Sequence, residues 1–432
     1  MMKPCHYACG TAEHVIRRRE FFGTLSRAGA GIALSSLGLF TRPAIAAALG
    51  RSQKRMLVIN MAGGLSQLES WDPKPGTATG GPFRAIATSA PGIQISELLP
   101  HTAKIMHHLS LVRSVNTHED DHGKGEYIMS TGRRKTPAQD YPQLGAVVAK
   151  ALDSENGALP GNIVITPGGG GGRNADSAYL GPRYSSVVLG NGAPPQFSQR
   201  PESLSENASI CANDLRHKIN DRFALRRRTA QTEAYTQSFE QGLELMRQRE
   251  IFDLTKEPAK DHERYGTEDF GRHCLLARRL IEKGLTYVRV THANYDTHNE
   301  NFNFHFEQLG DFDRPFATLI GDLHDRGLLE HTLVVVLSEF GRTPKINPTY
   351  GRDHFSKAWS ICVGGTGIKP GAVIGATNKD GNEVTDRQVD AGELFHTYLT
   401  ALGLQSHDHF KVAGQKMPMA DPAFDPIQEL LA

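Results

Sequence analysis

Carboxylates and imidazoles that could bind a metal gather in two short segments of the chain. Asp296 and His298 stand two residues apart, so an extended backbone puts both side chains on the same side. His354, beside Asp353, could complete a nitrogen and oxygen set of three with a position open for water, as in hydrolytic zinc sites. Such a metal would polarise a phosphoryl or sulfuryl oxygen. Alternatively, Asp296 and His298 cap a helix that begins near Asn301, and Asp353 and His354 make loop hydrogen bonds.

Two further candidate residues, Glu339 and Arg342, follow the apolar run at 333–336. They lie in the segment Leu-Ser-Glu-Phe-Gly-Arg, which ends at residue 342. Glu339 could bind a metal, orient a histidine that binds it, or act as a general base. The alternative is a salt bridge from Glu339 to Arg342. Arg342 could instead hold an anionic substrate through two parallel hydrogen bonds.

His122 closes a polar segment, Thr-His-Glu-Asp-Asp-His, that we expect to lead into a helix. Anions are favoured at helix N-termini, so the region suits an anionic substrate. The imidazole could bind metal, transfer protons or attack phosphorus directly. The alternative is a solvated helix start with Asp120 and Asp121 as capping acids.

The elements that must position these side chains alternate between strand and helix patterns. Predicted strands cover residues 56–60, 109–113, 162–166, 287–292, 333–336 and 360–364, and predicted helices cover 97–107, 123–130, 141–151, 270–283 and 391–402. Open α/β sheets place their chemistry outside the carboxyl ends of the strands, where the polar groups stand. The alternation predicts an α/β fold, with a mainly parallel central sheet and helices on both faces.

Residues 168–265 interrupt this alternation. A five-glycine run, 168–172, opens the stretch and is typical of a loop, because no Lys-Ser/Thr pair follows it. Residues 212–253 are polar and helix-compatible, with a thin apolar face from Leu215, Phe223 and Leu225. We expect a mostly helical insertion at about 168–265, serving as a lid or a contact surface, within a single domain of residues 49–432.

The amino-acid composition limits the classes of molecule that we expect the protein to bind. Charged residues make up 22% and hydrophobic residues 39% of the chain, with a net charge of +1, as in an ordinary globular protein. This balance gives no case for nucleic acid or an anionic membrane surface as a partner. Beyond the N-terminal region no segment reaches the ~18 apolar residues of a membrane span. The oligomeric state stays open.

The first 48 residues have the features of an export leader. Arg18 and Arg19 precede Glu-Phe-Phe, an apolar run and a small-residue cleavage region, which indicates the twin-arginine route and a periplasmic or secreted protein. Removing residues 1–48 removes six Lys and Arg and two Asp and Glu, so the net charge becomes +1 − 4 = −3. The remaining cysteines, at 211, 274 and 362, are too few and too scattered for a disulfide framework.

Several segments together resemble the secreted bacterial family catalogued as domain of unknown function 1501, a member of the alkaline phosphatase/sulfatase superfamily. The matching segments are Gly-Gly-Leu-Ser at 63–66, Trp-Asp-Pro-Lys-Pro at 71–75, Asp-His at 121–122, Met-Ser-Thr-Gly at 129–132, Tyr-Pro-Gln-Leu-Gly at 141–145, Tyr-Asp-Thr-His-Asn at 295–299, Ser-Glu-Phe-Gly-Arg-Thr-Pro at 338–344 and Gly-Arg-Asp-His at 351–354. The resemblance is spread from residue 57 to 403, which is nearly the whole chain after the predicted leader, and the order of the segments also fits.

The resemblance implies roles for particular positions. The strand that ends at Glu339 is similar to a sulfatase strand that supplies two metal ligands, of which Glu339 keeps the acid and Phe340 loses the second. Counting back from Thr-Gly-Arg at 131–133, the nucleophile position falls on His122. The sulfatase Cys/Ser-x-Pro-x-Arg pattern is missing, and Gly63-Gly64 replaces the metal-binding acids after the first strand.

These observations predict an exported metal-dependent hydrolase of phosphate or sulfate esters, with a small anionic ester or an anionic glycan as substrate. Zinc is the first expectation for the metal, with manganese and iron as alternatives. Asp296, His298 and His354 would bind it with Asp353 in support, while His122, Glu339 and Arg342 would act in catalysis. The alternative is a non-catalytic exported binding or structural protein that retains the fold.

Overall fold

The computed structural model describes residues 53–152, 160–169, 171–194, 199–225 and 230–432. The leader predicted for residues 1–48 lies outside this part of the chain. Residues 50–432 form one compact unit, and everything below concerns that unit.

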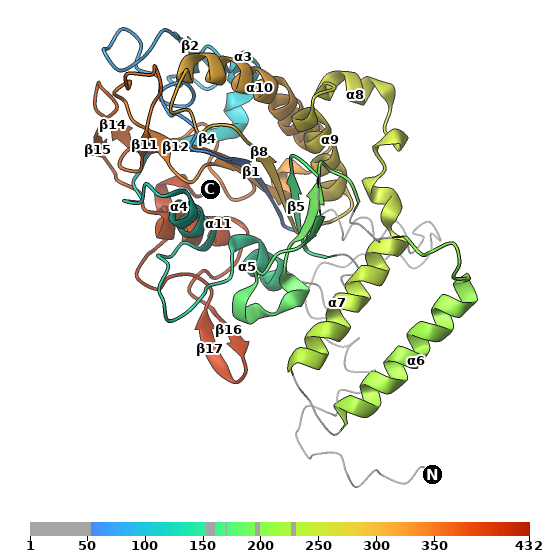
Figure 1. Ribbon diagram of the computed structural model, residues 1–432. Helices are drawn as coiled ribbons and strands as arrows, with labels where there is room; N and C mark the ends of the chain where they lie inside the picture. The colour runs from blue at the N-terminus through green and yellow to red at the C-terminus, as the bar shows by residue number, and fades with distance from the viewer. Residues whose placement is uncertain (1–52, 153–159, 170, 195–198, 226–229) are drawn as a thin grey trace, which may run out of the picture. The chain divides into compact units, whose positions relative to one another are not determined.

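A nine-stranded sheet runs through the unit (Figure 1). In spatial order its strands are β13 (Val373–Ile374), β4 (Leu109–Val115), β12 (Trp359–Gly365), β9 (Thr332–Leu337), β1 (Arg55–Met61), β8 (Tyr287–His292), β5 (Asn162–Thr166), β7 (Val187–Gly190) and β6 (Gly171–Arg173). Every residue of β1 and β9 is buried, as expected for central strands covered on both faces.

The sheet is mostly parallel, as the alternation of strands and helices predicts. β1 pairs in parallel with β8 and β9, and β5 pairs in parallel with β8 and β7. β12 is antiparallel to both β4 and β9, so β4 runs in the same direction as β9. β6 is the other antiparallel strand. The predicted α/β fold with a mainly parallel sheet is therefore confirmed.

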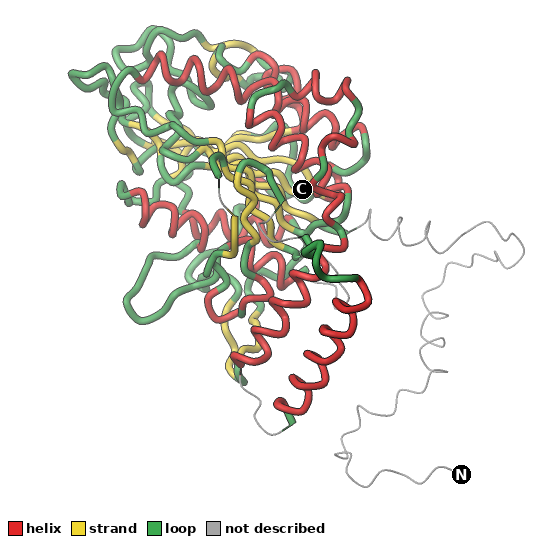
Figure 2. The backbone as a smooth tube through the Cα atoms, turned by 45° about the vertical axis from the view of Figure 1, so that its right-hand side comes forward, coloured by secondary structure: helices red, strands yellow, loops and turns green. Residues whose placement is uncertain are grey.

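Helices cover both faces of the sheet (Figure 2). In β1, Leu57 and Ile59 join a core with α3 (Pro100–Ile105), α9 (Asp269–Glu282) and α10 (Asn301–Asp325). Met56 and Val58 point the other way, into a core with α4 (His122–Thr131), α5 (Leu144–Ala151) and α11 (Ala391–Ala401). The alternation of side chains along a strand explains how one strand serves both cores.

The stretch 168–265 contains both helices and strands. It contains α6 (Glu206–Ala224), α7 (Ala230–Arg247) and α8 (Ala259–Tyr265), but it also supplies β6 and β7 to the main sheet. The strand β7 is only four residues long and follows a glycine-rich segment. Its apolar run was therefore too short to stand out in the sequence.

The described part of the chain has no helix long and apolar enough to cross a membrane. Its three cysteines are free, with Cys211 exposed and Cys274 and Cys362 buried.

Candidate metal centre

The site lies at the carboxyl edge of the parallel strands. Gly63 follows β1, Asp296 follows β8 and Glu339 follows β9. β4 leads through a polar loop to His122, the first residue of α4. Because β12 runs antiparallel, its amino end lies at this same edge, and His354 stands shortly before it. The topology thus places the chemically suited groups of distant segments side by side.

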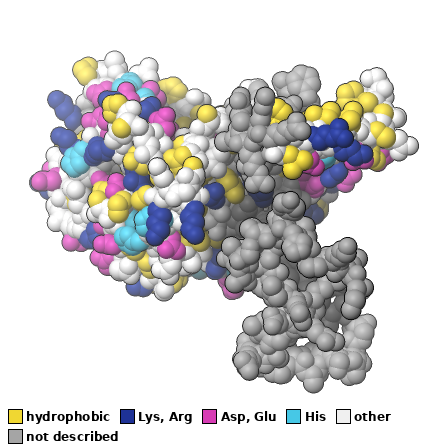
Figure 3. Space-filling model, turned by 90° about the horizontal axis from the view of Figure 1, so that it is seen from below, with side chains coloured by type: hydrophobic (Ala, Val, Ile, Leu, Met, Phe, Trp, Pro, Cys, Tyr) yellow, Lys and Arg dark blue, Asp and Glu magenta, His cyan; other side chains and the backbone are white. Residues whose placement is uncertain are grey.

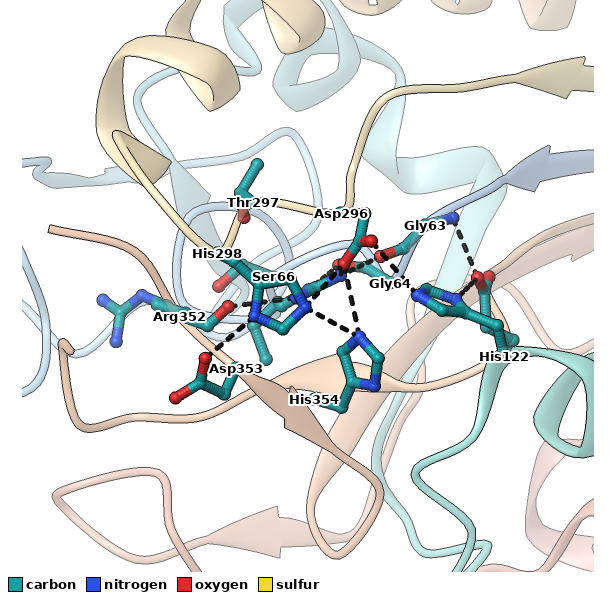
Figure 4. A network of polar contacts seen from close by, with 12 residues as sticks. Gly63, Gly64, Ser66, His122, Asp296, Thr297, His298, Arg352, Asp353 and His354 are labelled. Carbon is teal, nitrogen blue, oxygen red and sulfur yellow. Dashed lines mark hydrogen bonds and ion pairs between the residues drawn. The ribbon is translucent and has the colours of Figure 1, made fainter. Parts of the chain in front are cut away.

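Asp296, His298 and His354 face one another in the centre of the site (Figure 4). The Nε2 atoms of His298 and His354 lie 3.1 Å and 3.3 Å from Asp296 Oδ1. These two Nε2 atoms are 3.0 Å apart. Two ligand atoms bound at ~2.0–2.1 Å to a tetrahedral zinc ion are about 3.3 Å from each other. The three atoms therefore have nearly the spacing of ligands to one ion.

His122 directs a third imidazole toward the same carboxylate (Figure 4). Its Nε2 lies 3.3 Å from Asp296 Oδ2, and this nitrogen is buried without a hydrogen-bond partner. One ligand atom from each of His122, Asp296 and His354 lies within 4.8 Å of the others. An orphaned buried nitrogen beside a carboxylate is a group that a cation or a bound water would satisfy.

Each of the three imidazoles is oriented by an acceptor at its other nitrogen. His122 Nδ1 lies 2.7 Å from Glu339 Oε1, and His298 Nδ1 lies 2.9 Å from Asp353 Oδ1. The Nδ1 of His354 lies 2.7 Å from the carbonyl oxygen of Asp120. Because these partners accept hydrogen bonds, each Nδ1 carries the proton.

This arrangement leaves the Nε2 lone pairs pointing inward. At 3.0 Å, the lone pairs of His298 and His354 repel each other unless a proton or a metal ion lies between them. Neutral imidazoles held at Nδ1 by carboxylates or carbonyls are the usual form of metal-binding histidines. The donor set therefore fits a divalent ion that prefers nitrogen and oxygen ligands.

Arg342 holds the Asp296 carboxylate. Its Nη2 donates to Asp296 Oδ1 at 2.5 Å, and the guanidinium also donates to the carbonyl oxygens of Gly63, Gly64 and Arg352. Burial raises the pKa of Asp296, but the hydrogen bond and positive charge of Arg342 outweigh it and lower the pKa to about 2. Asp296 is therefore ionised at neutral pH.

The chain after β1 comes close to the loop that carries Asp296. Gly63 has a φ of +114°, and a Cβ there would lie 2.5 Å from the backbone nitrogen of Asp296. Its own N–H donates to Glu339 Oε1 at 2.9 Å. Phe340 packs against His122 and His354, with ring centroids 4.8 Å and 4.5 Å away. The glycine thus permits the close approach, and the phenylalanine forms an apolar wall beside the two imidazoles.

A fully buried ion pair between Arg352 and Glu69 fixes the residue that precedes Asp353. Arg352 donates from Nη2 to Glu69 Oε1 at 2.7 Å and from Nε to Glu69 Oε2 at 3.1 Å. The backbone N–H of Arg352 donates to the carbonyl of Thr297. Sequence reasoning missed Glu69 and the Asp120 carbonyl. Arg352 stands in the Gly-Arg-Asp-His segment, which was the only signal of its importance.

The structure also decides between several alternatives left open by the sequence. The helix α10 has Glu300 as its N-cap residue and no side-chain cap, so Asp296 and His298 do not cap it. Asp121 does cap α4, accepting from Lys124 N, while His122 faces the site. The carboxylate that pairs with Arg342 is that of Asp296. Asp353 contacts His298 at the nitrogen that faces away from Asp296.

Solved structures that match the chain include a sulfatase, an alkaline phosphatase and a lipoteichoic acid synthase. The PsFucS1 sulfatase from Pseudoalteromonas sp. shares 13% identity, covering 91% of this chain and 76% of that one, with a TM-score of 0.41. The alkaline phosphatase from the Antarctic bacterium TAB5 shares 11% identity, covering 82% and 99%, with a TM-score of 0.37. The lipoteichoic acid synthase LtaP from Listeria monocytogenes shares 8% identity, covering 86% and 75%, with a TM-score of 0.39.

At these scores the likeness says nothing about the activity of this chain. No curated protein matches the sequence. A protein-family model does match, over residues 53–431, which is nearly all of the compact unit. The chain therefore belongs to the family described as "Protein of unknown function (DUF1501)".

Proposed function

We propose that this chain is an exported metal-dependent hydrolase that cleaves phosphate or sulfate esters. The observation that carries the proposal is the convergence of inward-facing Nε2 atoms on the Asp296 carboxylate, with each imidazole oriented at Nδ1 by an acceptor. Hydrolytic metal sites combine a small set of nitrogen and oxygen ligands with room for water.

In this proposal Asp296, His298 and His354 hold the ion, which we expect to be zinc. Manganese and iron are alternatives that suit the same ligands. A bound divalent ion would supply Lewis acidity toward the ester oxygen and activate water. Asp353 acts by orienting His298, since it contacts the nitrogen that faces away from Asp296.

His122 and Glu339 are the pair that we assign to proton transfer. The Nε2 of His122 is buried and has no hydrogen-bond partner, although the side chain as a whole is 39% exposed. It can take a proton from an attacking water, or attack the ester itself as the nucleophile position implies. Glu339 stabilises the imidazolium that forms when Nε2 gains the proton.

Arg342 receives a different assignment from the one that its sequence position indicated. Its side chain is fully buried, and its donors are directed to Asp296 and three carbonyl oxygens. We assign it to fixing Asp296 in its ionised form rather than to holding an anionic substrate. The same observation favours the alternative function, an exported metal-binding protein without hydrolytic activity, because Arg342 is fully buried and directs four of its five N–H groups to Asp296 and the three carbonyl oxygens.

The first experiment measures metal content, which separates the hydrolase and the metal-binding protein from a purely structural protein. Mass spectrometry should find about one equivalent of metal on wild-type protein purified from a metal-supplemented culture, and the His298→Ala/His354→Ala variant should lose it. His407→Ala, which removes an exposed histidine elsewhere, is the matched control. Unchanged thermal unfolding of the variant without metal would show that the loss is local.

An ester screen then separates hydrolase from binding protein. Turnover of aryl phosphates or aryl sulfates that requires the metal and falls in His122→Ala would support the hydrolase. Stoichiometric metal with no turnover of either ester class would favour the binding protein. Absence of metal from wild-type protein, even after incubation with zinc and manganese, would contradict both metal-based functions.

A further inference from the structure

The segment between β10 (Gly341–Arg342) and β11 (His354–Phe355) lies against the backbone of His298. A Cβ on Gly351 would lie 2.0 Å from the carbonyl carbon of His298. Next to it, Tyr350 has a φ of +58°, a left-handed conformation that bulky residues rarely adopt. Backbone in such a conformation persists only where its surroundings hold it, and it is common at functional sites. The segment is therefore held in one position beside a proposed metal ligand.

Asn347 connects this segment to His298. Its Oδ1 accepts from the backbone N–H groups of Thr349 at 3.0 Å and Gly351 at 2.8 Å. Because a backbone N–H can only donate, the side-chain oxygen must face these two groups and the amide nitrogen must face the other way. The orientation of the Asn347 amide thus follows from the segment itself.

The amide nitrogen of Asn347 meets two acceptors at the metal centre. Its Nδ2 donates to the carbonyl oxygen of His298 at 2.9 Å and to Asp353 Oδ1 at 3.2 Å, which uses both hydrogens of the amide. The same oxygen of Asp353 lies 2.9 Å from His298 Nδ1. One side chain therefore holds His298 directly at its backbone and, through Asp353, at its ring.

We propose that Asn347 is a positioning residue of the metal centre, which sets the direction of the His298 Nε2 lone pair by holding both the backbone of His298 and the acceptor of its ring. The proposal rests on the metal binding in the proposed function and is independent of hydrolysis. The side chain of Asp353 is 55% exposed, so without Asn347 its carboxylate could turn toward water. Loss of an outer partner of a ligating histidine typically weakens metal binding about 10–100-fold.

The alternative is that Asn347 only closes a surface turn. Asn378 does this further along the chain, where its Oδ1 accepts from the backbone N–H of Asn382, four residues on, just as Asn347 Oδ1 accepts from Gly351. The Nδ2 of Asn378 donates to the Asn382 side chain, whereas that of Asn347 donates to His298, 49 residues away. Asn378 is therefore a matched control for the turn without the contact to the metal centre.

Dissociation constants for zinc and for manganese, measured by competition against chromophoric chelators, test the proposal. Asn347→Asp keeps the acceptor for the two backbone N–H groups but replaces the donor by an oxygen that faces two acceptors, and Asn347→Ala removes both. We expect the constant to rise about tenfold or more in each variant, and to stay at the wild-type value in Asn378→Asp and Asn378→Ala.

Weak metal binding elsewhere on the surface needs its own control. Histidine side chains stand near acidic ones on the face of the molecule shown in Figure 3. The metal bound by the His298→Ala/His354→Ala variant is therefore measured and subtracted. Thermal unfolding of the metal-free Asn347 variants should resemble that of the Asn378 variants, since each pair changes one turn.

A double-mutant cycle separates positioning from a general effect on the fold. Because Asn347 acts on the ring of His298 through Asp353, Asn347→Ala should weaken metal binding much less in an Asp353→Asn background than in wild type. A loss that adds in full to that of Asp353→Asn would overturn the proposal, because it would show that Asn347 supports the segment and not the ring.

The remaining outcomes separate this proposal from the proposed function. Wild-type protein that binds neither zinc nor manganese would overturn both. Metal binding by wild type with an unchanged dissociation constant in Asn347→Asp and Asn347→Ala would overturn the positioning role alone.

Discussion

One carboxylate oxygen of Glu339 contacts both the His122 ring and the backbone of the loop that follows β1. Its Oε1 lies 2.7 Å from His122 Nδ1 and accepts from Gly63 N at 2.9 Å, while Oε2 accepts from Ser338 Oγ. One buried acid therefore joins the ends of β1 and β9 to the start of α4. This contact fixes the direction in which the His122 Nε2 lone pair points.

Substituting Glu339 should separate proton transfer from metal binding. We expect Glu339→Gln to lower ester turnover about 10–100-fold, because a neutral amide no longer stabilises the imidazolium. Metal content should stay at the wild-type level, since Glu339 contacts neither His298 nor His354 by any described hydrogen bond. Glu383→Gln, an exposed acid elsewhere, is the control. Loss of metal in Glu339→Gln would instead place His122 among the ligands.

Asp353 should matter for metal affinity. Asp353→Asn removes the charged acceptor that orients His298, so we expect the zinc dissociation constant to rise about 10–100-fold. Competition against a chromophoric chelator measures this constant directly. Asp386→Asn changes an exposed acid outside the site and should leave the affinity unchanged. An unaltered affinity in Asp353→Asn would contradict the orienting role.

Gly63 should tolerate no side chain. Gly63→Ala places a Cβ 2.5 Å from Asp296 N at a φ of +114°, whereas the same change at Gly403, with a φ of +80°, meets open space. Left-handed backbone alone costs about 1–2 kcal/mol for an L residue. We expect Gly403→Ala to lose about that much free energy of unfolding, and Gly63→Ala to lose more and to bind metal poorly. Urea unfolding and zinc titration of both variants check this.

The buried pair Glu69–Arg352 should contribute to stability far more than an exposed pair. Removing one partner leaves an unpaired buried charge, so Glu69→Gln should lower the free energy of unfolding by about 3–5 kcal/mol. Glu97→Gln breaks the exposed pair with Arg84, 2.8 Å long, and should cost at most about 1 kcal/mol. Denaturant unfolding gives both values, and similar losses would refute the assignment.

Buried His292 should make stability depend on pH. Burial, with a smaller effect of the nearby His273 charge, lowers the pKa of His292 to about 4. Between that value and the unfolded pKa of about 6.5, the unfolded state binds more protons, so stability rises with pH in this window and falls on acidification. From pH 7 to pH 5 the loss should be about 2 kcal/mol.

The His292→Gln variant should lack this part of the pH dependence. Urea unfolding of metal-free protein at the two pH values measures it, with exposed His407→Gln as the control that should behave like wild type. Equal slopes for wild type and His292→Gln would show that His292 is not protonated on unfolding in this range.

Local patterns in the sequence were enough to predict the fold class and the central strands. Runs such as 333–336 have to be buried on both faces, and a strand buried on both faces requires helices above and below it. The polar residues beyond these strands were equally visible, which is why Asp296, His298 and His354 were predicted together as candidate metal ligands. The antiparallel direction of β12 was not visible, because a strand pattern is the same in both directions.

Only the tertiary structure decided which groups meet and which way they point. The Asp120 carbonyl, Glu69 and the inward turn of Arg342 depend on contacts between residues 46 to 283 positions apart in the chain, which local sequence patterns do not predict. The same holds for α6, whose Leu215 and Ile219 could have joined the core but are exposed in the fold. The sequence by itself determined the elements and the chemistry they carry, since both depend on near neighbours along the chain. The structure decided the site and its surfaces, since these arise from packing.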